Sequence, residues 1–267
     1  MRIVKKIELK ILVQILALGS ILFAQSPDFQ KSRLIRLGPV KDNTQVYTGL
    51  DLLILDKFQI IEDDTLAIVF NDGSVSGSGR HIIDVLGKNH AQNISLLIQG
   101  IEQEMISGSS GFVYNPVGFG GNWKTLSLKS DMDSLRKKEL LGAEMILFDI
   151  QDIGIRGTGE YQSLLLLMKL SAATQIPLYI LDRPNPLNAI SIEGPLSNNP
   201  PVPVRYGLTM GELAIMINEE GWLGKKPANL FVIPMKNYQR GMYFDETGLP
   251  WKILCKHFRN VETILLY

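Results

Sequence analysis

Two short apolar runs in the middle of the 267-residue chain each lead to an aspartate. Asp149 lies in the run 145–150, and Asp182 directly follows the run 177–181. The turns after these runs carry further polar and charged side chains, namely Gln151, Asp152, Arg156, Arg183 and Asn185. Open parallel sheets bind ligands at the carboxyl ends of their strands. If both runs are neighbouring parallel strands, these side chains converge at one edge of a sheet and form a binding site.

Polar residues elsewhere in the chain are expected to join the same edge. They are Asn71, which follows another apolar run, and Glu193, Arg205 and Glu212. Carboxylates, amides and guanidinium groups suit a ligand rich in hydroxyls or bearing a carboxylate, because each hydroxyl both donates and accepts hydrogen bonds. A sugar acid is a ligand of this kind.

Some of these residues also have a structural interpretation. Thr209 and Glu212 have the spacing of a capping box, which favours helix capping over catalysis for Glu212. Asp182 and Arg183 could form an ion pair that holds the loop before Pro184.

Asp149 is harder to explain structurally. A buried aspartate needs partners. Asp149 and Asp152 near Arg156 therefore form either a functional site or a structural network of charges whose burial costs free energy. We favour the site.

The elements that position these residues alternate along the chain. Apolar runs predict strands at 66–70, 93–98, 145–150, 177–181 and 230–235. Amphipathic or capped segments predict helices near 46–58, 80–88, 131–141, between the two central strands, and at 209–220. This order predicts an α/β three-layer sandwich with a mainly parallel sheet. The glycines within 107–121 lack the spacing of a phosphate-binding loop.

Composition excludes several classes of function. Lys+Arg and Asp+Glu are both 27, so a nucleic-acid partner has no electrostatic support. One cysteine excludes an intrachain disulfide, and three scattered histidines do not suggest a metal site.

The first 24 residues have the pattern of a secretory signal peptide, with basic residues before the apolar run 11–24. Cleavage after Ala24 predicts a periplasmic or extracellular protein, and an uncleaved signal anchor is the alternative. No other membrane partner is expected. Export disfavours cytosolic cofactors such as nicotinamide nucleotides and ATP. Residues 25–45 are polar and are expected to be a lead-in segment.

Four collinear segments resemble signatures of the bacterial exo-β-N-acetylmuramidase family, long catalogued as a domain of unknown function: FDIQDIGIR, LDRPNPLNAISIEGP, VRYGLTMGELA and MYFDETGLPW. TGLDLL and HIIDVL match more weakly. The resemblance implies a Rossmann-like domain over 46–240 and the start of a smaller ancillary domain over 241–267. It also implies cofactor-free removal of terminal N-acetylmuramic acid from the non-reducing ends of peptidoglycan fragments, with a sugar or muropeptide as the partner.

The chain departs from the family pattern at several positions. Where the family has Pro-Glu-His-Gly, this chain reads GIEQEM, with Glu102 as the best counterpart of the glutamate and Glu104 as the alternative. The family's aromatic run after Arg156 is replaced by GTGEY, and a glutamate common in the next helix is replaced by Lys169. The chain ends at Tyr267, before most of the ancillary domain, so a truncated gene product is a further alternative.

Glycoside hydrolysis generally needs two carboxyl groups, one on each side of the scissile bond. The resemblance implies that Glu102 is one of them, and Asp149 is the predicted second, with Glu160 or Glu193 as substitutes. Because the glutamate–histidine motif is altered, a relative that binds muropeptides or sugar acids without cleaving them is the main alternative to an enzyme.

Overall fold

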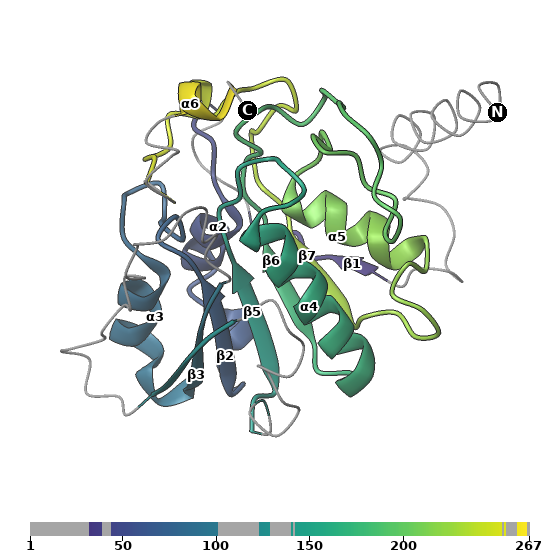
Figure 1. Cartoon of the computed structure of the whole chain (residues 1–267). Helices are drawn as coiled ribbons and strands as arrows, with labels where there is room; N and C mark the ends of the chain where they lie inside the picture. The colour runs from purple at the N-terminus through teal and green to yellow at the C-terminus, as the bar shows by residue number, and fades with distance from the viewer. Residues whose placement is uncertain are drawn as a thin grey trace. The chain divides into compact units, whose positions relative to one another are not determined.

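The fold is built on one parallel sheet (Figure 1). The computed structural model describes residues 32–38, 44–100, 123–128, 140, 142–252, 254 and 261–265. The sheet has seven strands in the order β1-β7-β6-β5-β2-β3-β4, and every pairing is parallel. The strands are β1 (Ser32–Leu34), β2 (Leu66–Phe70), β3 (Ile94–Gln99), β4 (Lys124–Ser127), β5 (Met145–Asp149), β6 (Leu178–Leu181) and β7 (Leu230–Ile233).

Helices cover both faces of the sheet. α4 (Gly159–Thr174) and α5 (Met210–Glu219) pack side by side against β6 on one face, which is the front in Figure 1. α2 (Gly49–Leu55) and α3 (Ile82–His90) share a hydrophobic core with alternate residues of the central strands on the other. Because both faces are covered, β2 and β5 are buried along their whole length and are apolar except for Asp149. The predicted α/β three-layer sandwich with a parallel sheet is confirmed.

Polar residues fix where the helices begin. The predicted capping box at α5 is confirmed: Glu212 N donates to Thr209 Oγ1 at 3.2 Å, and Thr209 N donates to Glu212 Oε2 at 3.0 Å. Thr48 and Asp51 form a second capping box at α2, and the side chain of Thr158 caps α4. Each cap satisfies backbone N–H groups that a helix start otherwise leaves without partners. These caps therefore fix the residues at which α2, α4 and α5 begin.

The structure differs from the sequence expectations in a few elements. Residues 32–34, expected to belong to a polar lead-in, form edge strand β1 beside β7, and β4 was not expected. α3 continues through Gly87 to His90. The helix predicted at 131–141 and the loop at 107–121 fall almost wholly outside the described residues. The domain boundary predicted at residue 240 stays a prediction.

Residues after 240 contact the carboxyl edge of the sheet. Two short helical segments lie there, η4 (Phe244–Thr247) and α6 (Val261–Leu265). Ile264 of α6 packs with Ile153 and Leu187, which follow β5 and β6. Among the described residues, no helix has the length and apolar character needed to span a membrane.

Candidate functional site

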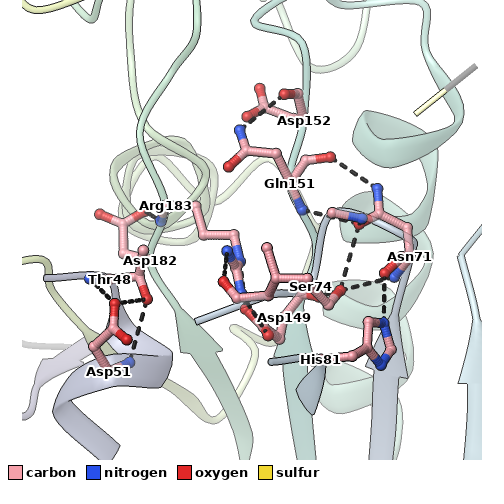
Figure 2. Close-up of polar contacts among 12 residues, drawn as sticks. Thr48, Asp51, Asn71, Ser74, His81, Asp149, Gln151, Asp152, Asp182 and Arg183 are labelled. Atoms are coloured by element: carbon pink, nitrogen blue, oxygen red, sulfur yellow. Dashed lines mark hydrogen bonds and ion pairs between the residues drawn. The ribbon is translucent and has the colours of Figure 1, made fainter. Parts of the chain in front are cut away.

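The strand order reverses between β2 and β5, the position where open α/β sheets usually bind ligands. From β2 the chain adds β3 and β4 on one side and then returns to place β5 on the other. Asn71 follows β2, and its Nδ2–H donates to the Gln151 carbonyl at 2.8 Å, while Gln151 N donates back to Asn71 Oδ1 at 3.2 Å (Figure 2). These two predicted site residues therefore join the two strand ends directly.

Asp149 is bound on both carboxylate oxygens. Arg183 Nε donates to Asp149 Oδ1 at 2.5 Å and Arg183 Nη2 donates to Oδ2 at 2.8 Å, while Nη1 donates to the Val75 carbonyl at 2.9 Å (Figure 2). The exposed fractions are 0% for Asp149 and 2% for Arg183. Burial raises the pKa of Asp149, and the Arg183 guanidinium opposes that shift. The catalytic role of Asp149 stays a prediction, but its carboxylate is closed to solvent and occupied by an internal partner.

The guanidinium of Arg183 thus pairs with Asp149, and not with Asp182 as the sequence had suggested. Asp182 Oδ1 accepts from Arg183 N at 3.1 Å and from Gly211 N at 2.8 Å, and Oδ2 accepts from the Thr209 hydroxyl at 2.8 Å. Burial and the nearby Glu212 carboxylate raise the pKa of Asp182 to about 7, although its hydrogen bonds oppose the shift. Asp182 therefore anchors the start of α5 to the end of β6.

Gln151 and Asn185 are also engaged in backbone contacts. Gln151 Nε2 donates to the Asp152 carbonyl at 3.0 Å and to the Pro184 carbonyl at 2.9 Å. Asn185 Nδ2 donates to the Leu208 carbonyl at 2.8 Å. These buried amides hold the loops after β5 and β6 together.

Glu193 and Arg205 border an open pocket. The pocket has a volume of ≈ 280 Å³ and is lined by Ile155, Leu187, Glu193, Gly194, Val204, Arg205 and Ile264. Arg205 Nη1 and Glu193 Oε1 form an ion pair at 3.3 Å, with side chains 14% and 67% exposed. Arg205 Nε is buried and has no hydrogen-bond partner within the described part of the chain. Of the predicted residues, this pair is therefore well placed to reach a ligand.

A second polar cluster surrounds Asp152. Asp152 Oδ2 accepts from the Tyr206 hydroxyl and from Gly154 N, the latter at 2.9 Å, and Oδ1 has no partner among the described residues. Burial raises the pKa of Asp152 to about 6. It also raises the pKa of Glu160 to about 7, to which the Asp152 charge contributes. Tyr206 was not among the residues predicted from the sequence, although it lies in the VRYGLTMGELA segment, three residues before the Thr209 cap.

The remaining predicted residues have separate positions. Arg156 Nη2 donates to the Pro195 carbonyl at 3.4 Å, so its guanidinium is not the partner of Asp149. Lys169 is exposed on α4, ten residues after Gly159 and hence about 15 Å along the helix from its start. Its charge is therefore remote from the carboxyl edge. Glu102 and Glu104 lie outside the described residues. Among those described, no group of three or more His, Cys, Asp or Glu could hold a metal ion.

Comparison with known proteins assigns the chain to a family. The model of the family described as "Exo-beta-N-acetylmuramidase NamZ, N-terminal" matches residues 66–262. The chain belongs to this family. The match begins at β2 and ends within α6, so it includes the strand ends and loops that carry the polar network.

Members of the NamZ family with known names or structures match most of the chain. The peptidoglycan β-N-acetylmuramidase NamZ of Bacillus subtilis (strain 168) is 27% identical over 236 residues, which cover 84% of this chain and 55% of the relative. Two crystal structures of DUF1343 family proteins from Bacteroides fragilis NCTC 9343 also match. One has a TM-score of 0.73 and 26% identity, covering 85% of this chain and 59% of that one. The other has a TM-score of 0.59 and 28% identity, covering 75% and 54%. The chain spans a little over half the length of these relatives.

Proposed function

We propose that the protein is an exported glycoside hydrolase that removes N-acetylmuramic acid from the non-reducing ends of peptidoglycan fragments. The observation that carries the proposal is the NamZ family match over residues 66–262. The carboxyl edge supports it, because an ion pair and buried carboxyl groups border the loops where a sugar acid would bind. No cofactor is required for this chemistry, since two carboxyl groups and a water molecule suffice.

The pocket beside Arg205 suits a sugar that carries a carboxylate. Arg205 is mostly buried and keeps an unpartnered Nε among the described residues, while its ion-pair partner Glu193 is largely exposed. The ion pair is open to solvent on the Glu193 side and therefore weak, so a ligand carboxylate can compete with Glu193 for the guanidinium. Ile155, Leu187 and Val204 supply apolar surface for the carbon skeleton of the ligand.

A chromogenic β-glycoside of N-acetylmuramic acid tests the activity. The purified chain is expected to release the chromophore, and Glu102→Gln is expected to abolish the release. The matched β-N-acetylglucosaminide lacks the lactyl carboxylate and should be cleaved much more slowly. Release no faster than that of the Glu102→Gln variant would refute the proposal.

The second candidate function is binding without cleavage, and the GIEQEM segment favours it because the family's glutamate–histidine motif is altered there. Titration calorimetry with N-acetylmuramic acid separates the two functions. Binding without turnover supports the second function, and absence of both excludes it.

The signal-peptide pattern supports export. Amino-terminal sequencing of protein recovered from outside the cytoplasm should begin at Gln25, and recovery of the full chain from the cytoplasm alone would contradict export.

A further inference from the structure

Backbone bridges join Arg205 to two other segments of the chain. Glu193 N donates to the Arg205 carbonyl at 3.0 Å, and Arg205 N donates to the Glu193 carbonyl at 2.9 Å. Arg205 also forms an antiparallel bridge with Ile155. Directly opposed residues of antiparallel segments present their side chains on the same face. The backbone therefore brings Ile155, Arg205 and Glu193 together at the pocket that all three line.

The guanidinium of Arg205 is held more firmly than the carboxylate that pairs with it. Arg205 Nη2 donates to the Leu187 carbonyl, and the Arg205 side chain is only 14% exposed. The Glu193 side chain is 67% exposed, and within the described part of the chain its carboxylate is held by one contact, the ion pair with Arg205 Nη1 at 3.3 Å. A solvent-exposed ion pair is weak. Glu193 can therefore turn away into solvent while the cation stays in place.

The cation lies beside an apolar wall. The apolar residues that line the pocket are Ile155, Leu187, Val204 and Ile264. Leu187 and Ile264 are 3% and 1% exposed and pack together in one hydrophobic cluster, so this part of the wall is fixed. A ligand that covers the wall removes apolar surface from water. A carboxylate attached to a carbon skeleton therefore gains a contact here that the exposed Glu193 side chain lacks.

We infer that Arg205 selects a negatively charged ligand over a neutral one, and that Glu193 is an internal competitor which the ligand carboxylate displaces. The inference rests on the proposed function for the ligand, a sugar that carries a carboxylate. In the exchange, the ion pair between Glu193 and Arg205 Nη1 breaks, a new ion pair with the ligand forms, and the Glu193 carboxylate moves into solvent. Both residues determine the specificity of binding.

Two ligands that differ only in charge test the role of Arg205. N-acetylmuramic acid and its carboxamide have nearly the same size, and only the acid carries a carboxylate. In titration calorimetry the wild type should bind the acid more tightly. Arg205→Gln should lower the ratio of the two affinities by about tenfold, because a cation donates stronger hydrogen bonds to a charged acceptor than to a neutral one. An unchanged ratio would overturn the role of Arg205.

Glu193→Gln distinguishes a competitor from a structural ion pair. Removing the Glu193 charge should raise the affinity for N-acetylmuramic acid by about two- to fivefold, which is the range of a weak, partly exposed ion pair. If the pair only held the loops in place, substitution of either member would weaken binding. The two variants should instead act in opposite directions, and an affinity that falls or stays constant in Glu193→Gln would overturn the role of competitor.

Glu220→Gln is the matched control for charge. Glu220 is exposed at the end of α5, and its substitution removes one negative charge as Glu193→Gln does. This variant should bind N-acetylmuramic acid as the wild type does. An equal rise in affinity in both variants would mean that the net charge of the protein, and not the exchange on Arg205, controls binding.

Binding and turnover together separate this inference from the proposed function. If the wild type cleaves the chromogenic glycoside of N-acetylmuramic acid and the affinity ratio does not depend on Arg205, the inference fails and the glycosidase function stands. If the two variants change binding as expected and the wild type cleaves nothing, the inference stands and the glycosidase function fails. If the wild type neither binds nor cleaves, both fail.

Discussion

Arg183 connects the ends of two strands and the loop after a third. It follows β6, binds both oxygens of Asp149 at the end of β5, and donates to the carbonyl of Val75 in the loop after β2. Removing one member of a buried ion pair leaves an uncompensated charge, which costs about 3–5 kcal/mol. We predict that Arg183→Met and Asp149→Leu each lower the free energy of unfolding in urea by this amount. The double variant should lose less than the sum, and strict additivity would show that the pair is not coupled.

Asp152 should make stability depend on pH. Burial raises its pKa to about 6, above the value of about 4 in an unfolded chain, so the unfolded state releases its proton first as the pH rises. The free energy of unfolding should therefore fall between pH 4 and pH 6, by up to about 3 kcal/mol from this residue. In urea titrations at pH 4.5 and 7.5, Asp152→Asn should reduce the difference in the free energy of unfolding between the two pH values. Tyr206→Phe should extend it to higher pH, because the Tyr206 hydroxyl lowers the pKa of Asp152. If the free energy of unfolding depended on pH equally in all three proteins, this account would be contradicted.

At the scale of elements, α2 and β6 meet backbone to backbone at Gly49. Gly49 N donates to the Asp182 carbonyl at 2.9 Å, and a Cβ added at Gly49 would lie 2.6 Å from Asp182 N and 2.7 Å from Leu181 Cα. Backbone atoms cannot yield as a flexible side chain does, so Gly49→Ala should cost about 1–3 kcal/mol of unfolding free energy or more. Gly38→Ala is the matched control, because nothing lies within 4 Å of its added Cβ. Equal midpoints in urea for both variants would rule out the close contact.

The long buried strands and capped helices were predicted from the sequence, and the short edge strands were not. β2 was predicted at its observed bounds because LAIVF is an apolar run between polar residues, and α5 was predicted from its capping box. β1 is three residues long and forms because it pairs with β7, a strand about 200 residues away in sequence. β4 has four residues, and three of them are polar. Short edge strands carry little periodic signal, so only the assembled sheet identifies them.

The sequence predicted where the two strand-end aspartates lie in the fold, but not which side chains they contact. Asp149 and Asp182 lie at the carboxyl ends of neighbouring parallel strands, as their spacing indicated. Sequence proximity suggested Asp182 as the partner of Arg183, but the guanidinium reaches Asp149, 34 residues earlier. Such a choice depends on side-chain geometry in space, which spacing along the chain does not encode.

For the whole molecule, the parallel topology gives the two ends of the sheet different roles. The loops after β5 and β6 lie at the carboxyl end of the sheet, and the opposite end contains the strand starts (Figure 1). The pocket that Glu193 and Arg205 border is lined by residues that follow β5 and β6 in the chain. A ligand at 100 times its Kd stabilises the folded state by about 2.7 kcal/mol, so its effect on local opening is measurable by hydrogen exchange. We predict that N-acetylmuramic acid slows amide exchange in residues 152–161 and 187–206. The amides at the amino ends of β5, β6 and β7 should exchange at unchanged rates, and protection centred there would place the ligand at the wrong end of the sheet.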